Sequence, residues 1–400
     1  MSRLSNPGSA GPLRAVSQPA IPAAALNGGP PFLVWPVARR EFYLAINIAI
    51  APTLLGGLVF FGPVAAVNLL ALVAGMLLSY PVLRLYTRRG RGMSFQHALA
   101  GTLVAGALTS PLYPWPAMLI VGLLIPLLTW LISTPGRHAL NLALLAPLVL
   151  LALYPLNGQG PLLARNRLLL GNVHHSSSLR SYHWPRAGKR QPADAVTLPV
   201  PEQQIQTLYK SIARKPVTFK SRELINQSFS FYLPSPTELI LGAVPGWIGT
   251  VSLLAIILGG LYLSYRHILQ PGSWLLFLSA VVMGLVFGPL SRGMFVDHFW
   301  QSLGGIWYLH GEQVIVLLTY ELCSGDFLFA SVFVLAFPGS LPMEPNARRF
   351  FLLLAGLLAA LTHRLALPVP PATFALLVLQ PLAPVFDALL HRRSWILQAG

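Results

Sequence analysis

A series of long apolar runs, nearly free of charged residues, constrains the fold of this chain more than any other feature. An α-helix of about 20 apolar residues spans the hydrocarbon core of a bilayer. Only structures that satisfy their own backbone hydrogen bonds can cross it, and the helix does so within one segment. We find ten such runs, at about 42–62, 64–86, 97–113, 116–134, 139–155, 246–265, 273–290, 313–337, 349–367 and 371–390. The sequence therefore predicts an all-α polytopic membrane protein of about ten transmembrane helices.

The composition and charge agree with a membrane protein. Only 10% of the residues are charged, whereas soluble domains carry about 25%. The net charge is +16, and outside the polar stretch at 156–242 the basic residues lie mostly in short clusters between apolar runs. Such clusters mark the cytoplasmic loops of membrane proteins. We therefore expect the chain to contact the lipid bilayer and no nucleic acid. The single cysteine, Cys323, excludes a disulfide framework.

The placement of arginine predicts the orientation of the helices. With the N-terminus in the cytoplasm, the clusters at 88–91, 348–349 and 392–393 all fall on the cytoplasmic side. The short external loops then carry only Arg292 and Arg364. We therefore expect both termini in the cytoplasm.

The apolar runs form two groups of five around a polar, proline-punctuated insert. The predicted segments are a disordered cytoplasmic tail (1–41), a first transmembrane half (42–155), an extracytoplasmic insert (156–242), a second transmembrane half (243–390) and a cytoplasmic tail (391–400). Because five is an odd number, the second half would be inverted relative to the first, as in many membrane proteins built from inverted repeats.

Two proline-broken segments occupy comparable places in the two halves. They are TSPLYPWP at 109–116 and FPGSLPMEP at 337–345. In inverted-repeat folds such interrupted helices meet near the bilayer midplane and line the pathway. Their freed backbone groups must be covered by protein. We therefore expect the third run, which the first of these segments breaks, to be a half-helix or a kinked span.

Two acids inside the eighth apolar run, Glu321 and Asp326, are candidates for an ion pathway. A charged residue at the bilayer centre costs ~3 kcal/mol or more, so it is a functional candidate by default. The two share a helix face only if Gly325 disturbs the helix. The alternative is a polar helix interface in which Ser324 or a backbone break satisfies them. Three amides within apolar runs, Asn47, Asn68 and Asn141, suggest hydrogen bonds between helices.

Several stretches resemble, in order, the D subunit of the Rnf electron-transport complex and the B subunit of the sodium-translocating NADH:quinone oxidoreductase. The resemblance covers most of residues 42–390. The stretches are GTLVAGALTSPLYPWPAMLIVGLL (101–124), GRHALNLALLAPLVLL (136–151), PTELILGAVPGWIGTVSLLAIILGGLYLSYRH (236–267), SGDFLFASVFVLAFPGSLPMEPNARRF (324–350) and FALLVLQPLAPVFD (374–387).

The resemblance implies a flavin cofactor, FMN or riboflavin, in a complex of membrane and peripheral subunits in a bacterial inner (plasma) membrane. It also implies FMN held through its phosphate on a threonine of a Ser/Thr-Gly/x-Ala-Thr element in the insert. The nearest stretch here is DAVTLPVP (194–201), where Pro199 and Val200 stand in place of the Ala-Thr pair. Valine has no hydroxyl, so covalent FMN is not expected there, and Thr197 is the alternative attachment residue. Ala336 and Phe337 replace a Thr-Asp pair of the family.

The predicted function is a membrane subunit of an Rnf- or Nqr-like ion-motive electron-transport complex, with flavin-mediated electron transfer coupled to cation translocation. The chain has no nicotinamide or iron–sulfur motif, so we do not expect it to be an enzyme alone. Two alternatives stay open at this point. One is an inverted-repeat transporter or channel without a redox role, and the other is a relative that has lost its flavin.

Overall fold

The computed structural model describes the helical parts of the chain and two short strands. The described residues are 39–86, 94–111, 113–132, 141–153, 163–164, 197–198, 236–242, 246–288, 311–337, 341–365 and 369–389. Apart from β1 (Leu163–Ala164) and β2 (Thr197–Leu198), which pair antiparallel, every regular element among them is helical. The predicted all-α polytopic class is confirmed.

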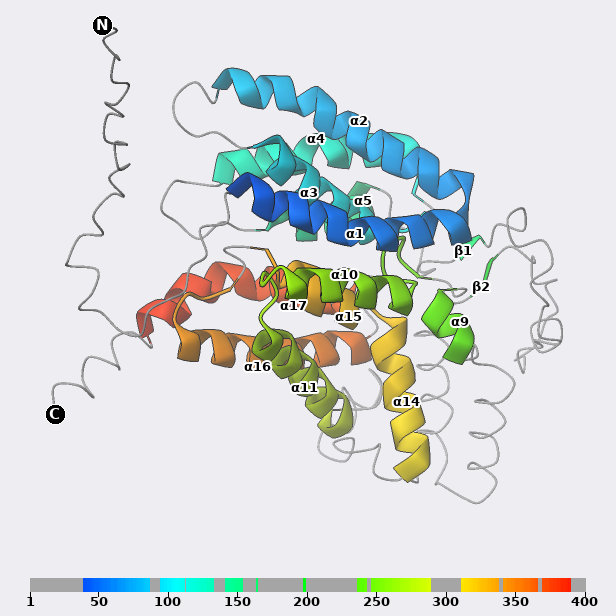
Figure 1. The fold of residues 1–400 in the computed structure, drawn as a ribbon, viewed down its shortest axis with the longest axis vertical. Coiled ribbons are helices and arrows are strands. Elements are labelled where there is room, and N and C mark those ends of the chain that lie inside the picture. Colours follow the sequence, from blue (N-terminus) through cyan, green and yellow to red (C-terminus); the bar gives the residue numbers. More distant parts are fainter. Residues whose placement is uncertain are drawn as a thin grey trace, which may run out of the picture. The chain divides into compact units, whose positions relative to one another are not determined.

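The elements follow the two predicted groups, shown in Figure 1. The first group contains α1 (Arg39–Phe61), α2 (Pro63–Tyr86), α3 (Phe95–Ala107), α4 (Trp115–Ile132), the 3-10 turn η3 (Leu142–Leu145) and α5 (Ala146–Leu153). A short helix, α9 (Pro236–Leu241), precedes the second group. That group contains α10 (Leu253–Tyr265), α11 (Pro271–Phe287), α14 (Gly311–Ser324), α15 (Phe327–Phe329), the π-helix η5 (Ala330–Val334), α16 (Pro345–Arg364), α17 (Pro371–Leu379) and the 3-10 turn η6 (Gln380–Leu382).

Four described helices are long and apolar enough to cross a membrane: Glu41–Phe61, Pro63–Arg84, Trp115–Ile132 and Pro371–Leu389. A fifth is the bent pair Leu317–Cys323 and Phe327–Val334, if its two pieces form one broken span. Three further apolar helices, Leu142–Leu153, Leu253–Tyr265 and Gly272–Phe287, are shorter. The chain is therefore a multi-pass membrane protein. The number ten, the inversion of the second half and the side of each segment stay predictions.

Corresponding helices make the principal contacts in the two groups. The second helix packs along the fourth in each case, α2 on α4 and α11 on α16. The first helices of the two groups, α1 and α10, pack against each other, and Figure 1 shows the blue-to-cyan and green-to-red groups meeting there. The two groups thus share this pattern of contacts between described helices.

Glycines allow the paired helices to approach closely. A Cβ atom on Gly122 of α4 would overlap the carbonyl oxygen of Leu72 in α2. In the second group, a Cβ atom on Gly356 of α16 would lie 2.7 Å from the carbonyl oxygen of Phe277 in α11. Lipid tails are as apolar as the helices, so association in a membrane depends on such close van der Waals packing.

We therefore expect Gly122→Ala to destabilise the protein by about 1–3 kcal/mol, because the added methyl group forces α2 and α4 apart. Gly101→Ala is the matched control. No atom lies within 4 Å of a Cβ built at Gly101, and alanine is the better helix former by about 1 kcal/mol. Unfolding of both variants in detergent measures the difference. A Gly122→Ala protein as stable as the Gly101→Ala protein would contradict this packing.

The third apolar run is interrupted as predicted, and protein covers its freed carbonyl groups. The side-chain amide of Asn68 donates to the carbonyl oxygens of Pro111 and Tyr113, each at 2.9 Å. Backbone N–H groups of the loop before α10 donate to the carbonyls of Ala107, at 2.8 Å, and Thr109, at 3.0 Å. Asn68 thus links α2 to the broken segment between α3 and α4. Of the two expected forms, a half-helix or a kinked span, α3 has the first.

Candidate functional site

The eighth apolar run is broken at the two candidate acids. α14 ends at Ser324 and α15 begins at Phe327, and the pieces Leu317–Cys323 and Phe327–Val334 are bent by 60°. The helix is thus disturbed near Gly325, which is the condition under which the two acids could share a face. Glu321 and Asp326 are both completely buried, with a relative exposure of 0%. Each must therefore be compensated by protein groups.

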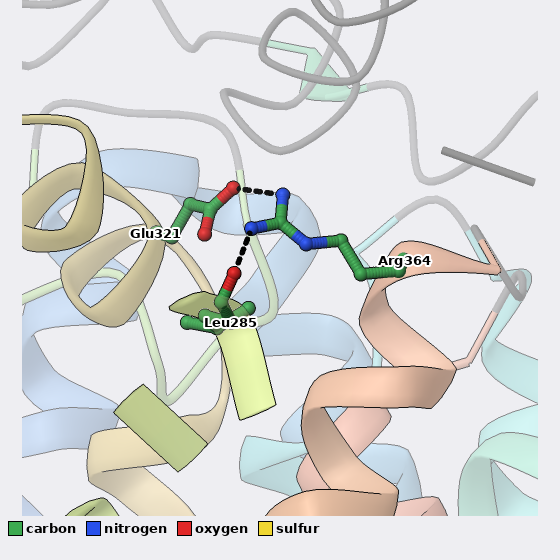
Figure 2. Close-up of polar contacts among 3 residues, drawn as sticks. All are labelled: Leu285, Glu321 and Arg364. Carbon is green, nitrogen blue, oxygen red and sulfur yellow. Dashed lines mark hydrogen bonds and ion pairs between the residues drawn. The ribbon is translucent and has the colours of Figure 1, made fainter. Parts of the chain in front are cut away.

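Glu321 forms a buried ion pair with an arginine of another helix. The Nη1 atom of Arg364, the last residue of α16, lies 2.6 Å from Oε1 of Glu321. The Nη2 atom of Arg364 donates to the carbonyl oxygen of Leu285 in α11 at 2.9 Å (Figure 2). The pair thereby joins α14, α16 and α11.

The prediction that Arg364 belongs to a short external loop is wrong. Its relative exposure is 2%, and it stands within the helix. The physical reason is that a buried carboxylate needs a counter-charge, and the guanidinium of Arg364 supplies it. His363, the preceding residue, is buried as well, and its ring centroid lies 5.3 Å from that of Phe327.

Asp326 binds the first turn of α17. Its Oδ1 accepts from the backbone N–H of Ala372 at 3.0 Å. Its Oδ2 accepts from the backbone N–H of Thr373 at 2.7 Å and from the Thr373 hydroxyl at 2.6 Å. The first N–H groups of a helix have no partner within the helix, and its dipole favours a negative charge there. The carboxylate is thus well stabilised, and it ties the break in the eighth run to the last one.

The two acids therefore meet different partners near the same connection. Arg364 ends α16, and Ala372 and Thr373 begin α17. Glu321 binds the last residue of α16, and Asp326 binds the first turn of α17. The arrangement ties the break to α16 and α17, and it places two carboxylates and one guanidinium in the apolar interior. Whether it also conducts an ion stays a prediction.

A second polar cluster joins the two groups of helices. The backbone N–H of Asn141, before η3, donates to Oε1 of Gln380 in η6 at 3.1 Å. The Oδ1 atom of Asn141 accepts from the backbone N–H of Ala143 at 3.3 Å. These bonds fix the orientation of both side-chain amides.

The remaining amide groups of this cluster lack acceptors. Asn141 Nδ2 and Gln380 Nε2 are buried and have no hydrogen-bond partner among the residues that the structure describes. A buried donor without an acceptor costs about 1–3 kcal/mol. The cluster therefore contains two amide donors that acceptor groups such as carbonyl oxygens or ring nitrogens could satisfy. Sequence reasoning assigned Asn141 to interhelical bonding and did not single out Gln380.

Thr197, the alternative site of flavin attachment, lies in β2 opposite Ala164 of β1. Asp194, Pro199 and Val200, on which the prediction about covalent FMN depends, lie outside the described residues. Among the residues that the structure describes, no group of three or more His, Cys, Asp or Glu side chains could hold a metal ion.

Comparison with known proteins identifies the family. No individually curated protein matches the sequence. The sequence model of the NQR2, RnfD, RnfE family matches residues 29–395, which include both groups of helices and the insert. The chain belongs to the NQR2, RnfD, RnfE family.

Proposed function

We propose that this membrane subunit of an Rnf- or Nqr-like complex binds a flavin non-covalently between its two groups of helices, and that its electron transfer is coupled to cation movement. Family membership supports the first part, a membrane subunit of such complexes. We further propose that the protein binds flavin, that it couples electron transfer to ion movement, and that it assembles with partner subunits in a bacterial inner membrane.

The pair of unpartnered amides carries the flavin proposal. Asn141 and Gln380 come from different groups of helices and are joined by a hydrogen bond, and each carries a buried side-chain amide nitrogen without an acceptor among the described residues. The isoalloxazine ring carries carbonyl oxygens and ring nitrogens that accept such bonds, so the two amides fit the group. Donors near these ring atoms tune the electronics of a bound flavin. When bound, the flavin supplies the electron-transfer chemistry, and the protein supplies binding and orientation.

Covalent attachment is not part of the proposal. The family element that carries the phosphoester ends here in Pro199 and Val200. Thr197 is the one residue of the matching stretch that could replace the missing threonine, and it lies in β2. A flavin held by Asn141 and Gln380 needs neither Thr197 nor a threonine at position 200.

The broken eighth run is the place for the coupled cation. Glu321 and Asp326 are the candidate residues, because carboxylates beside an interrupted helix suit a cation or proton site. The contacts of the two differ. Asp326 accepts three hydrogen bonds from α17, whereas Glu321 is paired with the guanidinium of Arg364. A cation that reaches Glu321 must therefore displace Arg364, and this exchange would make the pair a gate.

Gln380→Glu tests the flavin site. Glutamate keeps an oxygen for the Asn141 N–H but replaces the unpartnered Nε2 donor by a second oxygen. We expect the variant to bind flavin about 5–30-fold more weakly, as for the loss of one buried hydrogen bond. The visible absorbance of the purified protein, titrated with added riboflavin or FMN, measures the change.

Asn47→Leu is the control for this experiment. Asn47 is also a buried amide, but its Nδ2 donates to Gln96 between α1 and α3, at 2.9 Å to the side-chain oxygen. Its replacement should lower stability and leave flavin affinity unchanged. Equal flavin affinity of the wild-type and Gln380→Glu proteins would contradict the proposed site. Absence of flavin from the wild-type protein, with normal cation transport, would favour a transporter without a redox role.

A further inference from the structure

We propose that the end of α10 is a binding site for an anionic phospholipid, with the headgroup on Arg266 and His267 and an acyl chain along the helix. The site contains none of the residues of the two polar clusters, the Glu321–Asp326 break and the Asn141–Gln380 pair. It has an apolar part and a cationic part, and only a ligand with both chemistries uses the whole of it.

The apolar part is a stripe on one face of α10. Leu254, Leu258, Leu261 and Tyr265 follow one another at helical spacing, and their relative exposures rise from 47% through 50% and 63% to 80%. Residues spaced by three and four lie on the same face of a helix. In a protein that crosses a membrane, such an exposed stripe faces acyl chains. A tyrosine at its end suits the boundary between acyl chains and headgroups.

The cationic part begins directly after the stripe. Arg266 and His267 are exposed, and they follow Tyr265 at the C-terminus of α10. The side chain of Arg348 is brought to the same turn, because its Nη1 donates to Oε1 of Gln270 at 2.7 Å. Basic residues at a membrane surface attract anionic lipids.

The backbone of His267 has a left-handed conformation. Its φ is +55°, which makes His267 the one non-glycine residue with positive φ in the part of the chain that the structure describes. The N–H of Ile268 donates back to the carbonyl of Leu263 at 3.0 Å, and this closes the helix end in the usual glycine-containing arrangement. Glycine fits this conformation without strain. A histidine here therefore lowers stability relative to glycine, and it adds an exposed imidazole directly after Arg266 in the sequence.

A photoactivatable phosphatidylglycerol, with the reactive group on its acyl chain, tests the site in the purified full-length protein. We expect labelling of the segment 254–261, competed by unlabelled phosphatidylglycerol and not by phosphatidylcholine with the same chains. Arg266→Gln should weaken this competition about fivefold, the contribution of one basic residue at the membrane surface. Arg84→Gln, at the exposed end of α2, should leave labelling of α10 unchanged.

His267→Gly separates binding from folding. It should raise the midpoint of thermal unfolding in neutral detergent, because glycine relieves the backbone strain, and it should still reduce phosphatidylglycerol labelling. Labelling that neither His267→Gly nor Arg266→Gln reduces would overturn the proposal, as would equal labelling by a phosphatidylcholine probe. Competition by inorganic phosphate or a soluble acidic peptide as effective as that by phosphatidylglycerol would also overturn it, because these ligands do not use the stripe.

Discussion

Replacement of Arg364 by leucine is expected to destabilise the protein by about 3–5 kcal/mol, as for the loss of one partner of a buried ion pair. The substitution leaves the Glu321 carboxylate in an apolar interior without its guanidinium, and it also removes the donor to the Leu285 carbonyl. Unfolding by denaturant in detergent micelles measures the effect. The position stands at a helix end, so leucine does not disturb the helix itself.

Two further variants test whether the loss of the ion pair causes this effect. The double variant Glu321→Leu/Arg364→Leu should recover most of the lost stability, because apolar residues replace many buried ion pairs without cost. Arg348→Leu, at the other end of α16, removes an arginine that is only half-buried, so it should cost about 1 kcal/mol or less. A double variant as unstable as Arg364→Leu would show that the pair is not the source of the effect.

The second large effect is expected for Asp326→Asn. Asparagine replaces one carboxylate oxygen by an amide group, and that group then faces N–H and O–H donors of Ala372 and Thr373. At least one buried donor loses its acceptor, at a cost of about 1–3 kcal/mol. Thr373→Val is the milder control, since it removes only the hydroxyl and keeps the shape of the side chain. We expect it to cost about 1 kcal/mol.

Ion uptake separates the structural role of Asp326 from the proposed role in the ion pathway. If Asp326 carries a coupled ion, Asp326→Asn abolishes uptake into vesicles by protein that is folded and inserted, while Thr373→Val retains it. If uptake per folded molecule is unchanged in Asp326→Asn, Asp326 is a tie between helices only. Glu321→Gln is tested in the same vesicles. Loss of uptake in this variant, with uptake retained in Asp326→Asn, would indicate that the gate is the Glu321–Arg364 ion pair.

Much of the architecture follows from local pattern. The apolar runs predict the polytopic class, the prolines predict the interruption of the third run, and the Gly325 region predicts the break beside Asp326. These features depend on residues that are close together in the sequence. Asn47 was also predicted correctly as a link between helices, because its amide donates from α1 to Gln96 of α3.

The polar clusters could not be assembled in the same way. Arg364 lies 43 residues from Glu321, and Gln380 lies 239 residues from Asn141. A single sequence carries no information on which distant side chains meet. The requirement of a counter-charge for Glu321 could still have drawn attention to Arg364, which adjoins an apolar run.

The sixth apolar run shows why runs and helices differ in length. The run covers 246–265, but α10 begins only at Leu253, after the cap at Ser252. The residues before it form an irregular loop whose N–H groups bind the carbonyls of the interrupted α3. Apolar composition reports burial or lipid contact, and it does not distinguish a helix from a covered loop.

The fate of the flavin on denaturation tests the proposed function most directly. Full-length protein, purified in mild detergent, is unfolded and separated from small molecules, and flavin is measured in both fractions. We predict flavin in the small-molecule fraction and no fluorescent protein band. A fluorescent band that survives denaturation, and that Thr197→Ala abolishes, would contradict non-covalent binding, and flavin-free native protein would contradict the flavin site altogether.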